Sequence, residues 1–540
     1  MNQTHTTHTT RTPAVLSLLL FGLLFCLALA PRVLGVGTFV TSDENLWFDR
    51  SEAFGQALRT GDYARTNQAG HPGVTTMWLG AAGRWLHGSL TDRGGDGSTP
   101  EDPHDRALLR LPVAVVTALC IALAFPLLRR LFDLRVALLA GVLWATDPFL
   151  VAHSQLLHVD ALLASLMTLS LLAAMVASFS DGATPPAPAC QRMHPRIRLV
   201  VASAVAGGLA LLTKSPSVLL LPMVALATFL GTKSLWKTLQ TLLLWGGTAL
   251  GIWVALWPFA WVDLPGAVQR VWNEVAQNGA TPHGGGNFFL GHPVDDPGLL
   301  FYPVALVLRL TPWTLAGLLA AAVAARPRRQ TNQTRATLAV SLLILSVLLL
   351  LIALSVPSKK FDRYFLPASP ALVIVAAAGW VRLWERWEQW EPSSPFQFLR
   401  LLRLPHLPHL LFLSMSLLAT ITTAWYHPYE LAYYNPLVGG GSVAMQTILV
   451  GWGEGLEQAG DYLAAHSDDC DRPVLAWRAK KLGYFIGNPV LASLDASPDP
   501  VMLDYAVLYV NVAQRNAHDG TIRRAVGDHA ASAHHPYPWH

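Results

Sequence analysis

Charged residues and cysteine are both scarce in this chain. Of its 540 residues only 13% are charged, about half the share that soluble domains carry. The four cysteines are widely separated and form no CxxC pair, so neither a disulfide framework nor a zinc ribbon is indicated. The net charge of +4 arises mostly from arginines in short loops, which gives no indication of a nucleic acid partner.

Apolar residues make up 52% of the chain, and their long runs are typical of a polytopic membrane protein. Residues 1–13, rich in Thr and His, are expected to form a disordered cytoplasmic tail. The first apolar run ends in Ala28-Leu29-Ala30, which resembles a signal-peptide cleavage site, but the run is longer than usual for a signal and we expect it to be retained. Windows near the ~20 residues that a bilayer requires predict about eleven helical spans, at 14–35, 107–128, 136–152, 161–179, 199–212, 218–230, 239–259, 300–324, 336–354, 371–383 and 407–424.

Basic residues predict which ends of the spans face the cytoplasm. If the N-terminus lies inside, every short inner loop contains Lys or Arg residues, as the positive-inside rule requires. Merging the two apolar runs around Lys214 would invert this pattern for all later loops, so we interpret them as separate spans. We therefore expect a multi-pass protein of the plasma (inner) membrane with its C-terminus outside.

A transmembrane domain at 14–425 is predicted to carry two long outer loops, at 37–106 and 260–299. An outer C-terminal domain at 426–540 follows, and it is polar enough to fold in water. After the motif Gly451-Trp452-Gly453-Glu454-Gly455, it shows a helical pattern at 456–466 and strand-like runs at 473–477 and 506–512, which predict a small α/β domain. No phosphate-binding GxGxxG or GK[ST] motif follows these strands, so nucleotide binding is not indicated.

Asp43 and Glu44 form an acidic pair at the point where the first span leaves the membrane. Charges close to hydrocarbon require water, a partner or a function, so the pair is a candidate catalytic site. The alternative is that the two acids cap the helix that follows, because acids are favoured in a first helical turn. Asp160, at the start of the fourth predicted span, has the same two interpretations.

Lys214, Lys360 and Arg363 lie in short outer connections, against the positive-inside trend. They either contact anionic lipid headgroups and snorkel from helix ends, or hold an anion at the membrane surface. Outer carboxylates beside outer cations suit the transfer of a sugar from a lipid phosphate. A phosphate leaves without a general acid, so one carboxylate suffices as general base toward the acceptor hydroxyl, while Lys and Arg stabilise the departing phosphate.

Several stretches resemble multi-span GT-C glycosyltransferases, in particular the branch of protein O-mannosyltransferases and aminoarabinose transferases. They are the pair Asp43-Glu44, residues 146–150 with 158–163, residues 211–216 (LLTKSP) and residues 360–367 (KFDRYFLP). The resemblance covers about 14–424. It implies an α-helical GT-C membrane fold, a polyprenyl-phosphate sugar donor and inverting transfer of a hexose or pentose.

The resemblance also implies roles for individual residues. Asp43 matches the general base or acceptor-binding acid, with Glu44 as its neighbour, and Asp160, or alternatively Asp147, matches a second outer acid. The residues expected to hold the donor phosphate or orient the sugar are Lys214, Lys360, Arg363 and Tyr364. The residues expected to line the cavity are His71, His158, and His283 or His292. No cofactor is firmly expected, but a divalent metal held by Glu44, His71 and His283 is an open alternative.

The acceptor stays open among protein, lipid and glycan, because residues 426–540 do not resemble the β-trefoil insert of eukaryotic protein mannosyltransferases. The expected partners are the lipid-linked donor and membrane lipids, with no nucleic acid. Two alternatives are not enzymes: a polytopic transporter, or a non-catalytic scaffold for cell-envelope assembly. A transporter predicts charges in mid-span and matching broken helices in two halves. Mid-span charges are nearly absent and no internal repeat is evident, so the pattern favours the enzyme.

Overall fold

The computed structural model describes residues 14–70, 72–90, 102–179, 189–280, 282, 285–324, 333–389, 407–466, 474–476, 482–483, 485–486, 490–492 and 505–515. The expected tail at 1–13 and two of the expected cavity histidines, His71 and His283, lie outside these residues.

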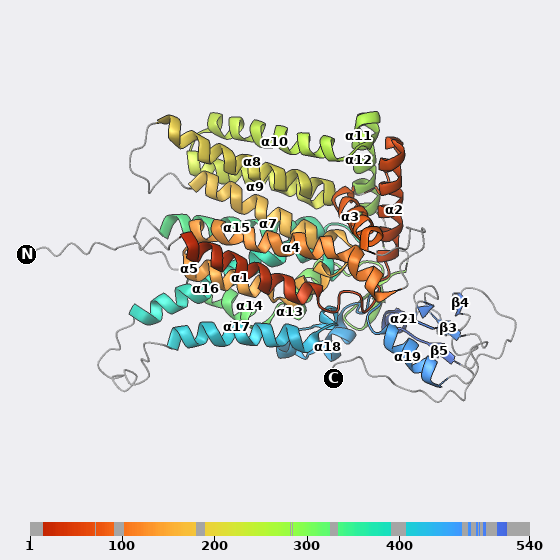
Figure 1. Cartoon of the computed structure of the whole chain (residues 1–540). Helices are drawn as coiled ribbons and strands as arrows, with labels where there is room; N and C mark the ends of the chain where they lie inside the picture. Colours follow the sequence, from red (N-terminus) through yellow and green to blue (C-terminus); the bar gives the residue numbers. More distant parts are fainter. Residues whose placement is uncertain are drawn as a thin grey trace, which may run out of the picture.

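Long apolar helices run side by side and form the body of the molecule (Figure 1). Within the described part of the chain, nine helices are long and apolar enough to cross a membrane, or up to eleven if two bent pairs each count as one span. This range confirms the predicted polytopic helical fold, and the runs on either side of Lys214 are indeed separate helices. The long helices are α1 (Ala14–Val33), α4 (Pro103–Leu131), α7 (Val159–Phe179), α8 (Ala189–Thr213), α9 (Leu220–Thr232, preceded by η2, Ser215–Leu219), α10 (Leu235–Leu256), α15 (Gln333–Ser355), α16 (Ser369–Gln389, preceded by η3, Asp362–Ala368) and α17 (Leu407–Tyr426).

Two of the predicted spans are broken in the structure. The predicted span 136–152 is α5 (Leu134–Ala145) and α6 (Pro148–Ser154), bent by 59°, and the predicted span 300–324 is α13 (Phe301–Arg309) and α14 (Pro312–Val323), bent by 115°. In each pair the second helix begins with proline, which lacks the amide that a continuous helix would need. Asp147 and Thr311 cap these second helices by accepting hydrogen bonds from the backbone amides of Leu150 (3.0 Å) and Thr314 (3.3 Å).

Helix α7 lies at the centre of the bundle and packs against α4, α8 and α9. Nearly all of its side chains are buried. Its Ser170 hydroxyl donates to the Ser203 carbonyl of α8 over 2.8 Å, and the Ser203 hydroxyl donates back to the Ser170 carbonyl over 2.7 Å. Such reciprocal bonds between small polar residues hold helices together where apolar surroundings offer no water. The start of α7, which carries Asp160, is thereby fixed on a rigid element.

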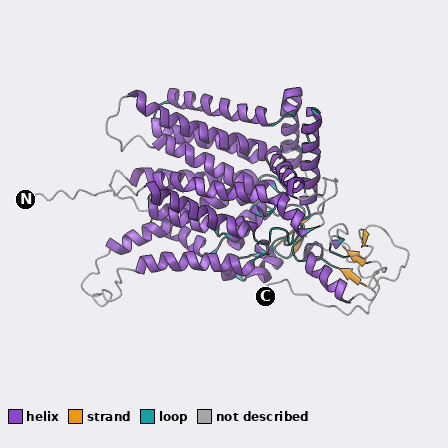
Figure 2. Cartoon of the chain, in the orientation of Figure 1, coloured by secondary structure: helices purple, strands orange, loops and turns teal. Residues whose placement is uncertain are grey.

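Shorter elements gather at one end of the bundle, which we call the site end (Figures 1 and 2). Here α2, α3 and α12 run across the direction of the long helices (Figure 1). The elements are α2 (Glu44–Thr60), η1 (Tyr63–Thr66), α3 (Val74–Leu90), α11 (Phe259–Val262), α12 (Leu264–Ala280), the antiparallel strands β1 (Asn287–Phe289) and β2 (His292–Val294), η5 (Glu430–Ala432), η6 (Pro436–Val438) and α18 (Gly440–Thr447).

The C-terminal segment also lies at the site end and holds a small α/β arrangement, as predicted (Figure 2). Helix α19 (Leu456–His466) has the predicted bounds, and β3 (Val474–Ala476) is the central strand of a parallel sheet in the order β4-β3-β5, with β4 (Val490–Ala492) and β5 (Tyr505–Val507). The predicted strand 506–512 is only partly correct, because helix α21 (Val510–Gln514) follows β5. Asn511 and Gln514 of α21 bond backbone carbonyls of Gly451 and Ile448, contacts that a continued strand would not make.

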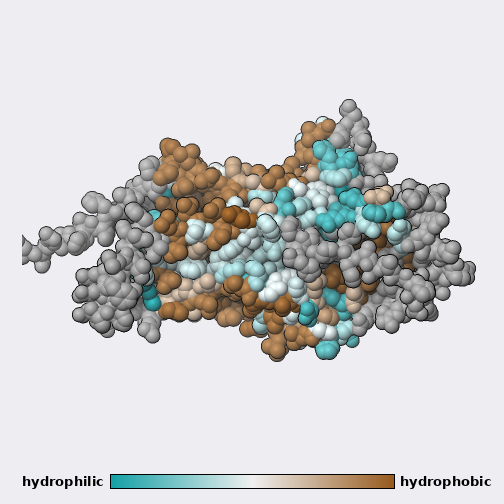
Figure 3. All heavy atoms as spheres, turned by 90° about the horizontal axis from the view of Figure 1, so that it is seen from below, coloured by the Kyte–Doolittle hydropathy of each residue, from teal (hydrophilic) through white to brown (hydrophobic). Residues whose placement is uncertain are grey.

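The opposite end of the bundle carries the N-terminus of α1 (Figure 1), and described basic residues of the predicted inner loops lie near it. Arg129 donates to the Ser17 hydroxyl (2.7 Å), and Arg135 pairs with Glu388 (3.4 Å). Seen from below, hydrophobic residues form large areas of the described helix surface on either side of a paler band, and the most hydrophilic residues gather toward the site end (Figure 3). Arg129 and Arg135 therefore lie at the end of the bundle opposite the acidic pair.

Candidate functional site

Asp43 occupies the N-cap position of α2, but its side chain makes no capping hydrogen bond to that helix. One carboxylate oxygen instead accepts a hydrogen bond from Nη2 of Arg363 over 2.9 Å, and the other lies 3.3 Å from the Ser42 hydroxyl. The side chain is 34% exposed and lines a cavity of about 70 Å³. Asp43 is thus an accessible acid whose side chain points to a cation and not to its own helix.

Glu44 follows directly but faces the protein interior, where it is fully buried. Its two oxygens accept hydrogen bonds from the Arg110 guanidinium of α4 at 2.7 and 2.5 Å, and one also accepts from the Leu157 amide at 2.9 Å. These bonds tie the start of α2 to α4 and to the turn before α7. The two neighbouring acids consequently have different surroundings, and Glu44 fixes the position from which Asp43 projects.

Asp160 lies in the first turn of α7 and is 1% exposed. Its carboxylate is 2.8 Å from Nζ of Lys214, 3.2 Å from Nδ1 of His158 and 3.7 Å from Nε of Arg363. A buried carboxylate requires such partners, because burial without them costs several kcal/mol. Asp160 therefore holds two of the predicted phosphate-binding cations at one place.

Arg363, from η3, is the residue that joins both acids, since it contacts Asp43 through Nη2 and lies near Asp160 through Nε. Its guanidinium carbon also lies 4.3 Å from the ring centre of Trp452, 4.6 Å from that of Phe361 and 5.6 Å from that of Tyr364. Arginine is well suited to this arrangement because its planar fork binds anions at the edge and stacks on aromatic rings through its face.

Lys214 and Tyr364 join the same cluster. The Lys214 ammonium lies 4.5 Å from the centre of the Tyr364 ring as well as 2.8 Å from Asp160. We call Asp43, Asp160, Lys214 and Arg363 the charged cluster. It contains two carboxylates and two cations brought from four separate parts of the sequence, and it lies at the site end of the bundle.

Lys360 is not brought into the charged cluster. Its side chain is 1% exposed, and its ammonium donates to Asp296 and to the Pro357 carbonyl, both over 2.6 Å. Burial alone would raise the pKa of Asp296, but the hydrogen bonds from Lys360 and the Gly298 amide outweigh it and hold that pKa below its ordinary value. Lys360 therefore anchors the segment after β2 to the loop before η3.

His158, His292 and Asp147, the other described candidates, do not share one location. His158 is buried, with its ring against Trp47 and Trp452 and its Nδ1 at Asp160. His292 is an exposed residue at the start of β2. Asp147 caps α6 and is not among the residues that line the cavity beside Asp43.

The described residues do not support the metal alternative. Within the parts of the chain that the structure describes, no three His, Cys, Asp or Glu side chains are placed to hold a metal ion. Glu44, the one described member of the expected set, has both oxygens occupied by Arg110. We derive no step through a metal.

Several residues at the cavity were not predicted from the sequence. Arg309 ends α13 at the sharp break, and it pairs with Asp362 at 2.7 Å and stacks 3.8 Å from the Tyr434 ring centre. A lone arginine inside an apolar run was a usable signal, because charges within spans mark functional or structural sites. The cavity is lined by Ser42, Asp43, His153, Arg309, Phe361, Asp362, Arg363, Leu431, Tyr434, Leu449, Gly451, Trp452, Glu454, Asn511 and Arg515.

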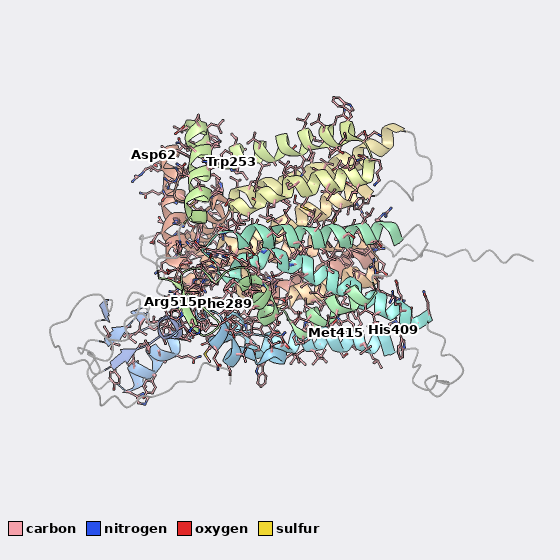
Figure 4. The ribbon with its side chains drawn as sticks, turned by 180° about the vertical axis from the view of Figure 1, so that it is seen from behind. Asp62, Trp253, Phe289, His409, Met415 and Arg515 are labelled. Carbon is pink, nitrogen blue, oxygen red and sulfur yellow. The ribbon has the colours of Figure 1, made fainter. Side chains whose placement is uncertain are left out.

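Residues after 425 supply eight of the fifteen residues that line this wall. Trp452 and Glu454 lie in the loop before α19, Asn511 belongs to α21, and Arg515 follows that helix. In the view from behind, the labelled Arg515 lies where the C-terminal segment meets the bundle, whereas His409 and Met415 lie along α17 away from it (Figure 4). The cavity is thus formed between the bundle and the C-terminal segment.

This chain is similar to one family model and to several solved structures. Residues 104–261 match the family model described as dolichyl-phosphate-mannose-protein mannosyltransferase. The structure of ArnT from Cupriavidus metallidurans bound to undecaprenyl phosphate is 17% identical, covers 89% of this chain and 86% of that chain, and has a TM-score of 0.50. The structure of the Archaeoglobus fulgidus oligosaccharyltransferase tethered with an acceptor peptide is 13% identical, covers 89% of this chain and 64% of that chain, and has a TM-score of 0.47. No curated protein matches the sequence.

The S. cerevisiae protein O-mannosyltransferase Pmt1-Pmt2 complex bound to the sugar donor is 18% identical over 48% of this chain and 35% of that chain, with a TM-score of 0.34. The family match and the ArnT comparison show that the chain has the polytopic helical GT-C fold and resembles GT-C glycosyltransferases of the mannosyltransferase and ArnT type. This confirms the resemblance drawn from the sequence motifs.

Proposed function

We propose that this chain is a membrane glycosyltransferase that moves a sugar from a polyprenyl-phosphate donor to an acceptor hydroxyl at the outer face of the membrane. The observation that carries the proposal is the charged cluster, in which Arg363 lies between an accessible carboxylate and a buried one at the rim of a cavity. The family match and the ArnT comparison, which was made with undecaprenyl phosphate bound, support the same class of donor.

The donor phosphate is assigned to Arg363 and Lys214. Both cations are held by Asp160, which is buried and so keeps them oriented without competing in the cavity. A phosphate bound there receives charge-assisted hydrogen bonds that strengthen as the bond to the sugar breaks and negative charge develops. Tyr364 lies beside Lys214 and supports its position. Lys360 acts on the surrounding loops through Asp296 and not on the phosphate.

Asp43 is assigned as the general base. It lines the cavity, is partly exposed, and shares Arg363 with the proposed phosphate site. When the phosphate binds the Arg363 guanidinium, the Asp43 carboxylate loses its hydrogen bond to that group. It can then accept the proton of the attacking hydroxyl. A single base acting opposite a phosphate leaving group gives inversion at the anomeric carbon. The carboxylate of Glu44, bound to Arg110, keeps Asp43 at this place.

The orientation follows from the charges at the two ends. Arg129 and Arg135 of the predicted inner loops lie at the end opposite the cluster, which supports a cytoplasmic N-terminus and an outer catalytic face. The proposed acceptor is a hydroxyl group of a protein, a lipid or a glycan. The plasma (inner) membrane is the proposed location.

The test uses the full-length protein reconstituted in liposomes with a panel of sugars linked to undecaprenyl phosphate. Wild-type protein is expected to release undecaprenyl phosphate from one of them when cell-envelope acceptor material is present, and Asp43→Asn is expected to release none while still binding the lipid. Turnover by Asp43→Asn at the wild-type rate overturns the base assignment. Mass spectrometry of envelope glycans and glycoproteins from cells lacking the protein identifies the missing sugar and its acceptor.

A further inference from the structure

The loop Gly451–Gly455, which we call the GWGEG loop, reaches from the C-terminal segment into the charged cluster. The Trp452 ring lies 4.3 Å from the guanidinium carbon of Arg363. Its centre also lies 5.1 Å from that of the His158 ring and 5.6 Å from that of the His153 ring, so it packs against two buried histidines as well as the guanidinium. None of the steps assigned above uses this residue.

The loop is rigidly attached to the segment that carries Asp43. The Ser42 amide donates to the Trp452 carbonyl over 2.9 Å. Gly453 has φ +133°, and a Cβ there would lie only 2.3 Å from the Val40 carbonyl, so only glycine permits this close approach. The GWGEG loop and the residues before α2 therefore form one packed unit.

Hydrogen bonds inside the C-terminal segment fix the orientation of the loop. The Trp452 amide donates to the Glu454 carboxylate over 2.8 Å, and the Gly453 amide donates to the Tyr509 hydroxyl, also over 2.8 Å. Glu454 is buried, with 3% of its surface exposed. The indole plane is consequently held in place by groups that do not belong to the membrane helices.

We propose that Trp452 is a positioning residue of the donor-phosphate site, through which the C-terminal segment controls the affinity for the lipid phosphate. The inference rests on the proposed function and deepens it. The guanidinium binds Asp43 at one edge and lies near Asp160 at another, and edge contacts alone would let this planar group rotate out of its plane. Of the three aromatic rings near it, Phe361 and Tyr364 come from its own loop, whereas Trp452 comes from a distant part of the chain and so links the guanidinium to the C-terminal segment. An aromatic face against the guanidinium removes that rotation and directs its remaining N–H groups into the cavity.

A purely structural role for Trp452 predicts a different result. If the indole only filled space between the loop and the bundle, its truncation would lower stability but leave the affinity of folded protein for phosphate unchanged. An aromatic ring is also not interchangeable with an aliphatic side chain of similar size if stacking matters. The two roles are therefore separated by comparing Trp452→Phe with Trp452→Leu.

The experiment measures the Kd of undecaprenyl phosphate for the full-length protein in detergent, together with its thermal unfolding. Trp452→Leu is expected to weaken binding about tenfold, as loss of one desolvated cation–π contact implies, and Trp452→Phe to stay within about threefold of wild type. Trp85→Leu, at an exposed tryptophan of α3, is the matched control and is expected to bind as wild type.

An unchanged Kd for folded Trp452→Leu, or equal losses in the Leu and Phe variants, overturns the positioning role and leaves the proposed function intact. A wild-type protein that neither binds undecaprenyl phosphate nor releases it from any donor overturns the proposed function itself, and the inference with it.

Discussion

The Arg363 guanidinium donates a hydrogen bond to the Asp43 carboxylate over 2.9 Å, although 320 positions separate the two residues in the chain. The same guanidinium lies 3.7 Å from Asp160 and against the Trp452 ring. The start of α2, the start of α7, the loop at η3 and the C-terminal segment thus meet at one side chain. How that side chain is held determines whether Asp43 is paired or available as a base.

Replacing Arg363 with lysine keeps the charge but removes the planar fork. A lysine ammonium can meet one carboxylate but not bridge two while stacking on Trp452, so we expect kcat/KM for the lipid-linked donor to fall by about 10- to 100-fold. The measurement is steady-state transfer with purified protein. Arg59→Lys on α2, where the arginine is 68% exposed, is the control and should behave as wild type. Wild-type kinetics for Arg363→Lys would show that charge alone suffices.

Loss of charge at the two adjacent acids is expected to affect different properties, namely stability for Glu44 and sugar transfer for Asp43. Glu44→Gln removes one partner of a fully buried ion pair and leaves Arg110 uncompensated, which should lower stability by about 3–5 kcal/mol. Asp43→Asn affects a partly exposed pair and should change stability by less than about 1 kcal/mol while abolishing transfer. Thermal unfolding and transfer assays on both variants check the contrast. Equal stability losses would contradict the separation of roles.

The fold was largely predictable because hydrophobic run length and loop charge are local signals. They predicted the separate helices around Lys214 and about eleven spans, which agrees with the upper end of the nine to eleven found in the described residues. The breaks after Ala145 and Arg309 were not predicted as breaks, because the apolar runs continue through them. Proline at the first position of α6 and of α14, after a capping Asp or Thr, was the available sign.

The members of the site were predictable only in part. Asp43, Asp160, Lys214 and Arg363 were found from charge at predicted outer ends, and the structure brings them together. Composition gave no means of telling that Lys360, three residues from Arg363, points to Asp296 instead. The contribution of Trp452 depends on how the C-terminal segment packs on the bundle, and such long-range packing leaves no periodic pattern in the sequence.

The pair Asp160–Lys214 should show strong coupling. Asp160→Asn leaves Lys214 and Arg363 close together without their shared counter-charge, so we expect a stability loss of about 3 kcal/mol or more. Removing Lys214 as well relieves part of this repulsion, so Asp160→Asn with Lys214→Met should cost less than the sum of the single changes. A double-mutant cycle by thermal unfolding measures the coupling, and strict additivity would show that the two side chains do not interact energetically.

Lys360→Met should separate a structural cation from the phosphate-binding ones. Because the Lys360 ammonium is 1% exposed and bound to Asp296 and the Pro357 carbonyl, its loss should destabilise the loop before η3. The Kd for undecaprenyl phosphate should stay within about twofold of wild type in folded protein, whereas Lys214→Met should raise it about tenfold or more. If the two changes raised the Kd equally, Lys360 would have to be counted among the phosphate-binding residues.

The ion pair between His427 and Glu430 should make stability depend on pH near neutrality. Nδ1 of His427 lies 2.8 Å from the buried Glu430 carboxylate, and this hydrogen bond raises the pKa of His427 above its ordinary value of 6.5. A raised pKa means that the protonated ring binds more tightly in the folded protein, so the stabilisation is complete below pH 6.5 and is lost as the pH rises through the folded-state pKa. Wild type should therefore unfold at a higher temperature than His427→Gln at pH 6, and the gap should narrow toward pH 9. Thermal unfolding of both proteins across this range checks the sign, and a gap that is constant or grows with pH would contradict it.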